Sequence, residues 1–133
     1  MNQQKHIRDF LDGAPHAVVG ASRDRTKIGN MVLQAFHQKG RPVFPVNPGT
    51  AEVEGHASYP DLASLPEMIH GVCVITPPAV TERIVEEAGA LGVKCIWLQP
   101  GAESETAVAR AQELGMNVIS GGPCVLVELG YSH

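Results

Sequence analysis

Residues 20–29 read Gly-Ala-Ser-Arg-Asp-Arg-Thr-Lys-Ile-Gly and combine the residue types that hold a phosphate group. Gly20 and Ser22, on either side of Ala21, allow the main chain to turn tightly so that backbone N–H groups face outward. A helix that begins near Ile28 aims the positive end of its dipole at the same place. The segment therefore predicts an anion site of a size that suits a diphosphate.

The positions of the charged residues and glycines limit which class of phosphate-binding site this segment can form. Arg25 and Lys27 add full positive charges, while Gly29 suits either ligand contact or close packing of the helix on the sheet. The dinucleotide pattern GxGxxG is absent because position 22 is serine, and no Gly-Lys-Ser/Thr marks a Walker loop. The pattern indicates a nucleotide site outside the two commonest phosphate-loop classes.

The residues that follow the second apolar run help to distinguish between NAD and other nucleotide cofactors. An NAD site usually has Asp or Glu there to hold the adenosine ribose, but this chain has Asn47 followed by Pro48. A carboxylate would repel a phosphorylated ribose, and a neutral amide does not. Because coenzyme A (CoA) carries a 3′-phosphate on that ribose, Asn47 favours CoA over NAD.

Turn-forming and polar residues also follow three further apolar runs. They are Thr76-Pro77-Pro78, Gln99-Pro100-Gly101 and Gly121-Gly122-Pro123-Cys124. Each group alone is ordinary turn chemistry. Because the carboxyl ends of parallel strands meet at one edge of a sheet, the groups together predict a cleft.

No recognisable catalytic or metal-binding constellation is present in the sequence. GxSxG, HExxH, CxxC and paired carboxylates are absent, and the six histidines have no partner in a motif. Ser22 fits a turn or phosphate-contacting hydroxyl. The thiol of Cys124 could meet the thiol of CoA, although a simply packed cysteine is favoured. We expect a binding protein without its own catalytic site and without a metal.

The elements that would position these residues follow from hydrophobic periodicity. Five apolar runs are typical of strands buried on both faces of a parallel sheet, at 17–20, 43–46, 72–75, 95–98 and 117–120. Stripes at helical spacing lie between them: Ile28, Met31, Val32, Ala35 and Phe36; Val80, Ile84, Ala88 and Leu91; Ala107, Val108, Ala111 and Leu114. Gly40, Gly92 and Gly115 mark helix ends, and a helix is expected at about 2–12.

Alternating strands and helices predict an α/β fold: a Rossmann-like, doubly wound, mainly parallel sheet of five or six strands in three α/β/α layers. Residues 1–133 are expected to form a single domain. The Pro- and Gly-rich connection 47–71 leaves room only for a short edge strand near 56–58 and a helical turn near 61–65. Pro45 cannot donate to a ladder, so the run 43–46 should lie at or near the sheet edge.

Composition excludes several function classes. Hydrophobic residues make up 44% of the chain and charged residues 18%, which is typical of a globular protein. The sequence shows neither a membrane-spanning apolar run nor a secretory signal, so we expect a cytoplasmic protein without a membrane partner. Positive charge clusters near residues 23–27, which is too local for a nucleic-acid surface and suits a small anion.

Taken together, these motifs resemble a known family, the stand-alone CoA-binding proteins, which are similar to the N-terminal CoA-binding domain of succinate–CoA ligase alpha subunits. The residues that carry the resemblance are VVGAS at 18–22, Gly29, PVNP at 45–48, Glu54-Gly55 before Tyr59, ITPP at 75–78, WLQPGA at 97–102 and Cys124. The resemblance extends from about Asp9 to Glu128. The motifs are weak singly and specific as a set.

The resemblance implies a role for each candidate residue. Gly20, Ala21, Ser22 and the segment to Ile28 would cradle the phosphates; Asn47 and Pro48 would flank the adenosine; Thr76, Pro77 and Pro78 would line the pantetheine path; Gln99 and Gly101 would lie further along. The ligase subunits carry a lysine soon after the second strand that meets a phosphate, and this chain has Gly49-Thr50 there. Either the matching charge would come from Arg23, Arg25 or Lys27, or the affinity would be lower.

The sequence is compatible with three functions. The first is a non-catalytic module that binds CoA or an acyl-CoA. The second is an NAD(H)-binding Rossmann protein, either a redox sensor or dehydrogenase-like, and the third is the CoA-binding component of a ligase-type complex. In each case the partner is a small nucleotide-containing ligand, with a protein partner or a homo-oligomer left open.

Overall fold

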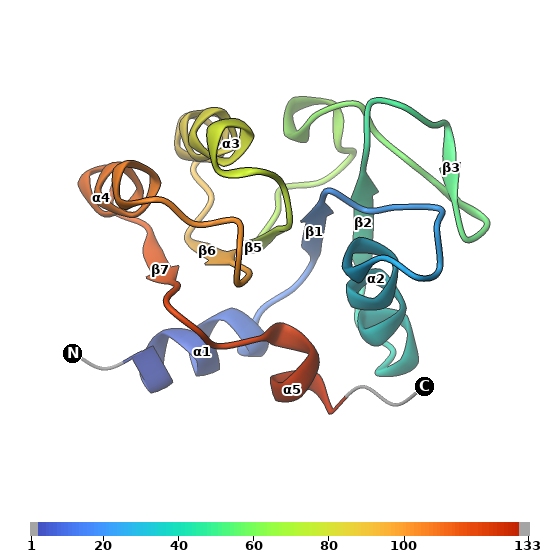
Figure 1. Ribbon diagram of the computed structural model, residues 1–133, viewed down its shortest axis with the longest axis horizontal. Helices are drawn as coiled ribbons and strands as arrows, with labels where there is room; N and C mark the ends of the chain where they lie inside the picture. Colours follow the sequence, from blue (N-terminus) through green and yellow to red (C-terminus); the bar gives the residue numbers. More distant parts are fainter. Residues whose placement is uncertain (1–2, 131–133) are drawn as a thin grey trace.

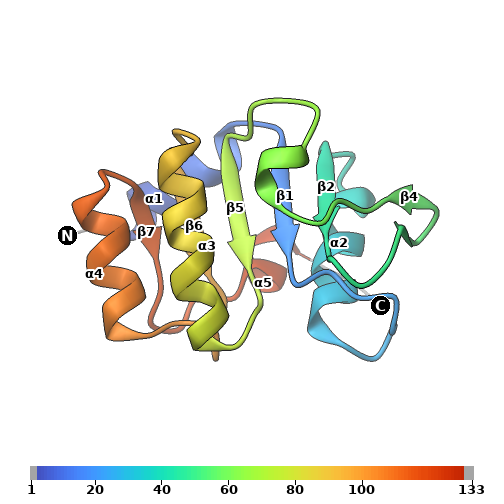
Figure 2. The ribbon, with the colours of Figure 1, turned by 90° about the horizontal axis from the view of Figure 1, so that it is seen from above.

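The computed structural model describes residues 3–130 and contains a five-stranded parallel sheet in the order β2-β1-β5-β6-β7 (Figures 1 and 2). The strands are β1 (His16–Val19), β2 (Val43–Val46), β5 (Gly71–Val74), β6 (Cys95–Leu98) and β7 (Asn117–Ile119). This sheet confirms the Rossmann-like α/β fold, with five rather than six strands. β2 is an edge strand, as Pro45 predicts.

Helices cover both faces of the sheet and give the three layers (Figure 1). α3 (Pro78–Ala90) and α4 (Glu105–Glu113) lie on one face. α1 (Gln3–Asp12), α2 (Ile28–Gln38) and α5 (Val125–Leu129) lie on the other. Every residue of β1, β5 and β6 is buried, because apolar side chains of these strands enter a separate core on each face.

The connection between β2 and β5 differs in part from the sequence prediction. The expected edge strand near 56–58 is instead half of a separate hairpin, β3 (Glu52–Val53) and β4 (His56–Ala57), which is antiparallel. Just after this hairpin, an isolated parallel bridge joins Tyr59 to Val46 of β2. The expected helical turn is present as a 3₁₀ turn, η1 (Leu62–Ser64).

The positions where helices end were predicted more accurately than the residues that form their buried faces. α2, α3 and α4 each end two residues before a glycine with positive φ, at Gly40, Gly92 and Gly115. The predicted apolar stripes are rotated slightly from the buried faces: Ile28 is 40% exposed and Leu91 is 42% exposed. In α2 the buried face includes Gly29 and Asn30 instead.

Side chains from three other segments fasten the last turn of α1 to the amino-terminal edge of the sheet. His70 Nε2 donates to the Asp9 carbonyl at 2.7 Å, and His16 Nε2 donates to the Phe10 carbonyl at 2.6 Å. Arg41 Nη1 donates to the next carbonyl, that of Leu11. Three consecutive carbonyls that the helix leaves unpaired are thus satisfied. No helix within residues 3–130 is long and apolar enough to cross a membrane.

Candidate functional site

The strand order places a topological switch between β1 and β5. From β1 the chain passes through α2 to β2 on one side, and it then returns across β1 to build β5, β6 and β7 on the other. Open α/β sheets bind ligands outside the carboxyl ends of the strands at such a point. The first candidate position is therefore the space above the ends of β1, β2 and β5.

A cavity of about 380 Å³ occupies this position. Its lining is Val19, Gly20, Ala21, Ser22, Val46, Asn47, Pro48, Pro60, Asp61, Thr76, Val80, Arg83, Ile84 and Glu87. One wall comes from the β1–α2 loop and the end of β2, and the facing wall comes from α3. A second hollow of about 260 Å³ lies near the opposite edge of the sheet, against Met68 and Leu91, and contains none of the predicted site residues.

Close backbone packing shapes the β1–α2 loop. Gly20 has φ of +98°, and a Cβ there would lie 2.8 Å from the carbonyl oxygen of Ile75. A Cβ on Gly29 would collide with the carbonyl oxygen of Gly20. Only glycine lets α2 begin this close to the loop. Gly29 therefore serves close packing, one of the two roles that its position predicts.

The loop presents main-chain donors to the cavity. Within residues 3–130, the N–H groups of Ala21 and Ser22 donate to no acceptor of the protein. The N-cap of α2, Lys27, makes no side-chain hydrogen bond to the first turn of the helix. An anion can satisfy such unpaired groups, and the helix dipole adds to the attraction.

Side chains within the loop fix its course. Asp24 N donates to Ser22 Oγ at 3.0 Å, while the Asp24 carboxylate accepts from Thr26 N at 2.9 Å and from Thr26 Oγ1 at 2.7 Å. These bonds from Thr26 lower the pKa of Asp24. The loop therefore carries a fixed negative charge among its basic residues, and Ser22 holds a turn.

Arg25 is engaged by the β3–β4 hairpin. Its Nε and Nη2 donate to the two carboxylate oxygens of Glu54 at 3.0 and 2.9 Å. Buried Asn30 donates to the same carboxylate at 2.8 Å and to the Ser22 carbonyl at 2.9 Å. The bonds from Arg25 and Asn30 lower the pKa of Glu54 to about 2. The charge of Arg25 is thus offset by a carboxylate, and Arg25 does not line the cavity.

Asn47 joins two walls of the cavity. Its Nδ2 donates to the Ala21 carbonyl at 2.8 Å, and its Oδ1 accepts from Gly49 N at 2.7 Å. Its own N–H donates to the Tyr59 carbonyl at 2.9 Å. The side chain therefore holds the loop after β1 to the loop after β2. Pro48 lies beside it on the cavity lining.

The remaining predicted residues extend along the same sheet edge. Thr76 lines the cavity and shares a hydrogen bond of 2.8 Å with Thr81, whereas exposed Pro77 and Pro78 begin α3. Gln99 is 2% exposed: its Oε1 accepts from Val125 N at 2.8 Å, so its amide supports the start of α5.

Other candidates at this edge lie outside the cavity lining. Gly101, with φ of +95°, donates its N–H to Glu103 at 2.7 Å. Cys124 is half-buried and accepts from Gln99 Nε2 at 3.4 Å. Lys27 and Ile28 stand exposed at the start of α2. The cavity thus gathers Gly20, Ala21, Ser22, Asn47, Pro48 and Thr76, and the other predicted residues are outside its lining.

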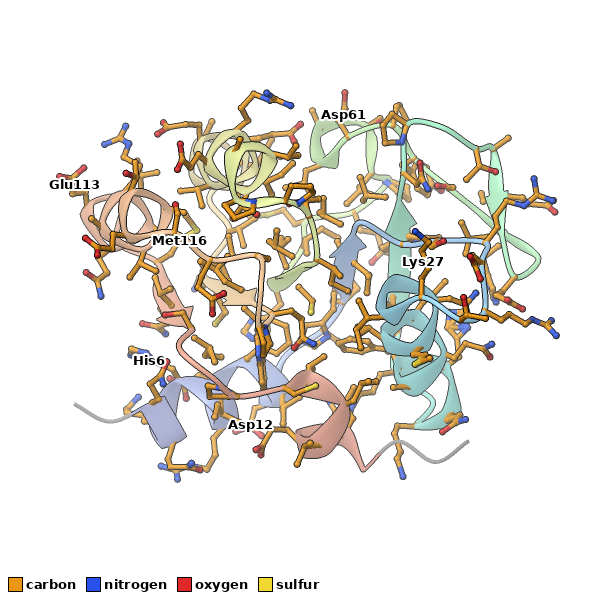
Figure 3. The ribbon with its side chains drawn as sticks, in the orientation of Figure 1. His6, Asp12, Lys27, Asp61, Glu113 and Met116 are labelled. Atoms are coloured by element: carbon orange, nitrogen blue, oxygen red, sulfur yellow. The ribbon has the colours of Figure 1, made fainter. Side chains whose placement is uncertain are left out.

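Sequence reasoning missed three charged residues that line the cavity: Asp61, Arg83 and Glu87. Figure 3 shows Asp61 beside η1 on the face that α3 covers, and Lys27 at the start of α2 on the other face. The available signal was the spacing of Val80, Ile84 and Glu87, which fall on one side of α3. No group of three or more His, Cys, Asp or Glu side chains within residues 3–130 could hold a metal ion.

Comparison with known proteins gives a consistent match. The model of the "CoA binding domain" family matches residues 15–130. A solved structure of a conserved hypothetical protein from Pyrococcus furiosus is 36% identical, with a TM-score of 0.82, and the match covers 87% of this chain and 99% of that one.

Two curated relatives differ in length. The alpha subunit of an ADP-forming acetate–CoA ligase II from Pyrococcus furiosus is 29% identical over an alignment of 127 residues, and the match covers 87% of this chain and 28% of that subunit. The uncharacterized protein YneT from Bacillus subtilis is 28% identical over 85% of this chain and 84% of its own length. The chain spans less than a third of the ligase relatives that it matches.

Proposed function

Because the chain belongs to the CoA-binding domain family, we propose that it binds CoA or an acyl-CoA in the cavity at the switch point, as a module without catalytic activity of its own. The observation that carries the proposal is the pair of unpaired N–H groups at Ala21 and Ser22 on the cavity wall. They offer a diphosphate the donors that a phosphate loop supplies.

The rest of the cavity suits the other parts of CoA. Val46 and Pro48 give an apolar surface at the end of β2, and Val80 and Ile84 give another on α3. A flat adenine fits between such surfaces. Thr76 lies at the exit of β5, where the pantetheine arm would leave toward Gln99 and Gly101. Asn47, already committed to two hydrogen bonds, sets the width of the site and adds no negative charge.

The cavity lining supports a binding role. Its titratable side chains are Asp61, Arg83 and Glu87, and none of these accompanies a nucleophile in an activating geometry. The similarity to an acetate–CoA ligase alpha subunit favours a second candidate, a CoA-binding component that works with a partner chain. In that case the partner would supply the chemistry.

NAD(H) is the other competing ligand, and one observation favours it. Asp61 and Glu87 bring carboxylates to the cavity that could accept hydrogen bonds from ribose hydroxyls. Each of them already accepts a hydrogen bond from the η1 segment: Asp61 from Ser64 N at 2.9 Å, and Glu87 from Ala63 N at 3.2 Å. The neutral Asn47 and the absence of GxGxxG weigh toward CoA.

Titration calorimetry with CoA, dephospho-CoA and NAD decides between these ligands. We expect CoA to bind most tightly, because it carries the diphosphate, the additional ribose phosphate and the pantetheine arm. Binding of NAD with equal or higher affinity would contradict the proposal. Mass spectrometry of any ligand that the protein retains on purification distinguishes free CoA from an acyl-CoA.

A further inference from the structure

Arg83 is a cavity cation that neither a hydrogen bond nor an ion pair engages within residues 3–130. Its side chain is exposed on α3. Three other arginines are engaged within the protein: Arg25 by Glu54, Arg110 by Glu86 and Glu113, and Arg41 by the Leu11 carbonyl. The charge of Arg83 is therefore available to a ligand.

Helix geometry directs this charge toward the site. Arg83 is the sixth residue of α3, so it lies roughly 8 Å along the axis from the first residue. Side chains of a helix lean toward its amino terminus, and α3 begins at the exit of β5. The guanidinium thus lies on the opposite wall from the N–H groups of Ala21 and Ser22.

The cavity consequently has groups that can attract a phosphate on two separate walls. The β1–α2 loop offers main-chain donors and the start of α2, while α3 offers Arg83. NAD carries its phosphates in one diphosphate, whereas CoA carries a diphosphate and a distinct phosphate on the ribose. A cavity with phosphate-attracting groups on two walls matches the second arrangement.

Two carboxylates close to Arg83 would repel a phosphate, so the positive charge of Arg83 matters more for phosphate binding at this wall. Asp61 and Glu87 line the same part of the cavity, and both are held toward η1 by hydrogen bonds from Ser64 and Ala63. Without Arg83, a phosphate here would meet two negative charges and no cation on this wall. The arginine attracts the phosphate and offsets part of the repulsion from these two carboxylates.

We propose that Arg83 binds the 3′-phosphate of the CoA ribose and makes the protein select CoA over dephospho-CoA. The inference rests on the proposed function and assigns a specificity-determining residue to that site. It also names a source for the charge that Gly49-Thr50 does not supply.

The test compares two ligands across matched variants. Arg83→Gln should weaken CoA binding by about tenfold and leave dephospho-CoA binding within about twofold of wild type, since only CoA carries the phosphate. Arg83→Lys should recover part of the preference. Arg8→Gln, an exposed arginine on α1, is the control for loss of one positive charge and should change neither affinity.

The outcomes separate the two proposals. Equal weakening of both ligands by Arg83→Gln would assign Arg83 to the diphosphate and overturn the inference while CoA binding stands. An unchanged CoA affinity would likewise overturn it. Failure of the wild-type protein to bind either ligand overturns the proposed function, and the inference with it. Circular dichroism of each variant confirms that the fold is retained.

Discussion

At the scale of single residues, the site depends on which side chains are already committed within the protein. Asn47 is predicted from its position at the end of β2, yet its amide joins two loops. Arg25 is predicted as a phosphate cation, yet Glu54 binds it in a bidentate pair. The sequence identifies side chains that are able to bind a ligand. The folded structure shows which of them are already bonded to other groups of the protein.

The Arg25–Glu54 pair leads to a testable coupling. Arg25→Ala should weaken CoA binding by about threefold to tenfold, because it leaves the Glu54 carboxylate uncompensated beside the phosphate loop. Glu54 has a pKa of about 2 and stays ionised at neutral pH. Adding Glu54→Gln to Arg25→Ala should restore a large part of the affinity, as measured by calorimetry.

A direct contact between Arg25 and the ligand gives a different pattern. In that case the double variant would bind CoA as weakly as Arg25→Ala alone. Lys27→Ala serves as the reference, because Lys27 has the same charge in the same loop and no ion pair within residues 3–130. The size of its effect measures the loss of one unpaired loop cation.

At the scale of elements, the strands were predictable and the helix faces less so. The five apolar runs lie within one residue of the observed strands because parallel strands buried on both faces leave little ambiguity. The buried face of α2 was misjudged at Asn30, a polar residue whose amide pairs with Ser22 and Glu54. Arg83 was missed because an exposed arginine on a helix is ordinary, and only its spacing from Val80 and Glu87 places it on the cavity side of α3.

The junction of α2 with the β1–α2 loop gives the prediction at this scale. Gly29→Ala should lower the free energy of unfolding by about 2 kcal/mol, because the new Cβ meets a backbone carbonyl that cannot move aside alone. Gly89→Ala, also within a helix, is the matched control. Its Cβ would meet the flexible Leu114 side chain, and alanine favours the helix.

Urea denaturation of both glycine variants provides the measurement. We expect a clear decrease in the free energy of unfolding for Gly29→Ala and a distinctly smaller change for Gly89→Ala. Equal stability of the two variants would show that α2 can shift away from the loop at little cost. CoA affinity should also fall in Gly29→Ala, since the same shift disturbs the donors at Ala21 and Ser22.

At the scale of the whole molecule, the carboxyl and amino edges of the sheet have different roles. The carboxyl edge carries the cavity, and the amino edge holds α1 through His16, His70 and Arg41. His16 is fully buried, and its Nδ1 has no hydrogen-bond partner among residues 3–130, as fits a neutral ring that donates only through Nε2. Burial is the main cause that lowers its pKa to about 4; His70 and Arg41 act in the same direction, and the hydrogen bond to the Phe10 carbonyl acts against it.

The buried histidine predicts a dependence of stability on pH. Above pH 6.5 the ring is neutral in both the folded and unfolded states, so it imposes no penalty. As pH falls from 6.5 toward 4, the unfolded state takes up a proton that the folded state refuses, and stability is lost, by about 3 kcal/mol in total.

Urea denaturation at pH 7 and pH 5 tests this effect in the wild type and in His16→Phe. The phenylalanine variant lacks the titrating ring, so the difference between the two proteins cancels the contribution of other groups. We expect the wild type to lose more stability than the variant over this interval. Parallel losses would show that His16 is protonated in the folded protein, contrary to its burial.

The fastening of α1 has a consequence for how sequences of this kind can diverge. The contacts that hold Asp9, Phe10 and Leu11 lie at the amino edge, and the residues that line the cavity lie at the carboxyl edge. Mutations in the cavity loops therefore leave the α1 anchor untouched. Substitutions that alter ligand preference at the carboxyl edge are thereby separated from the contacts that hold the scaffold together at the amino edge.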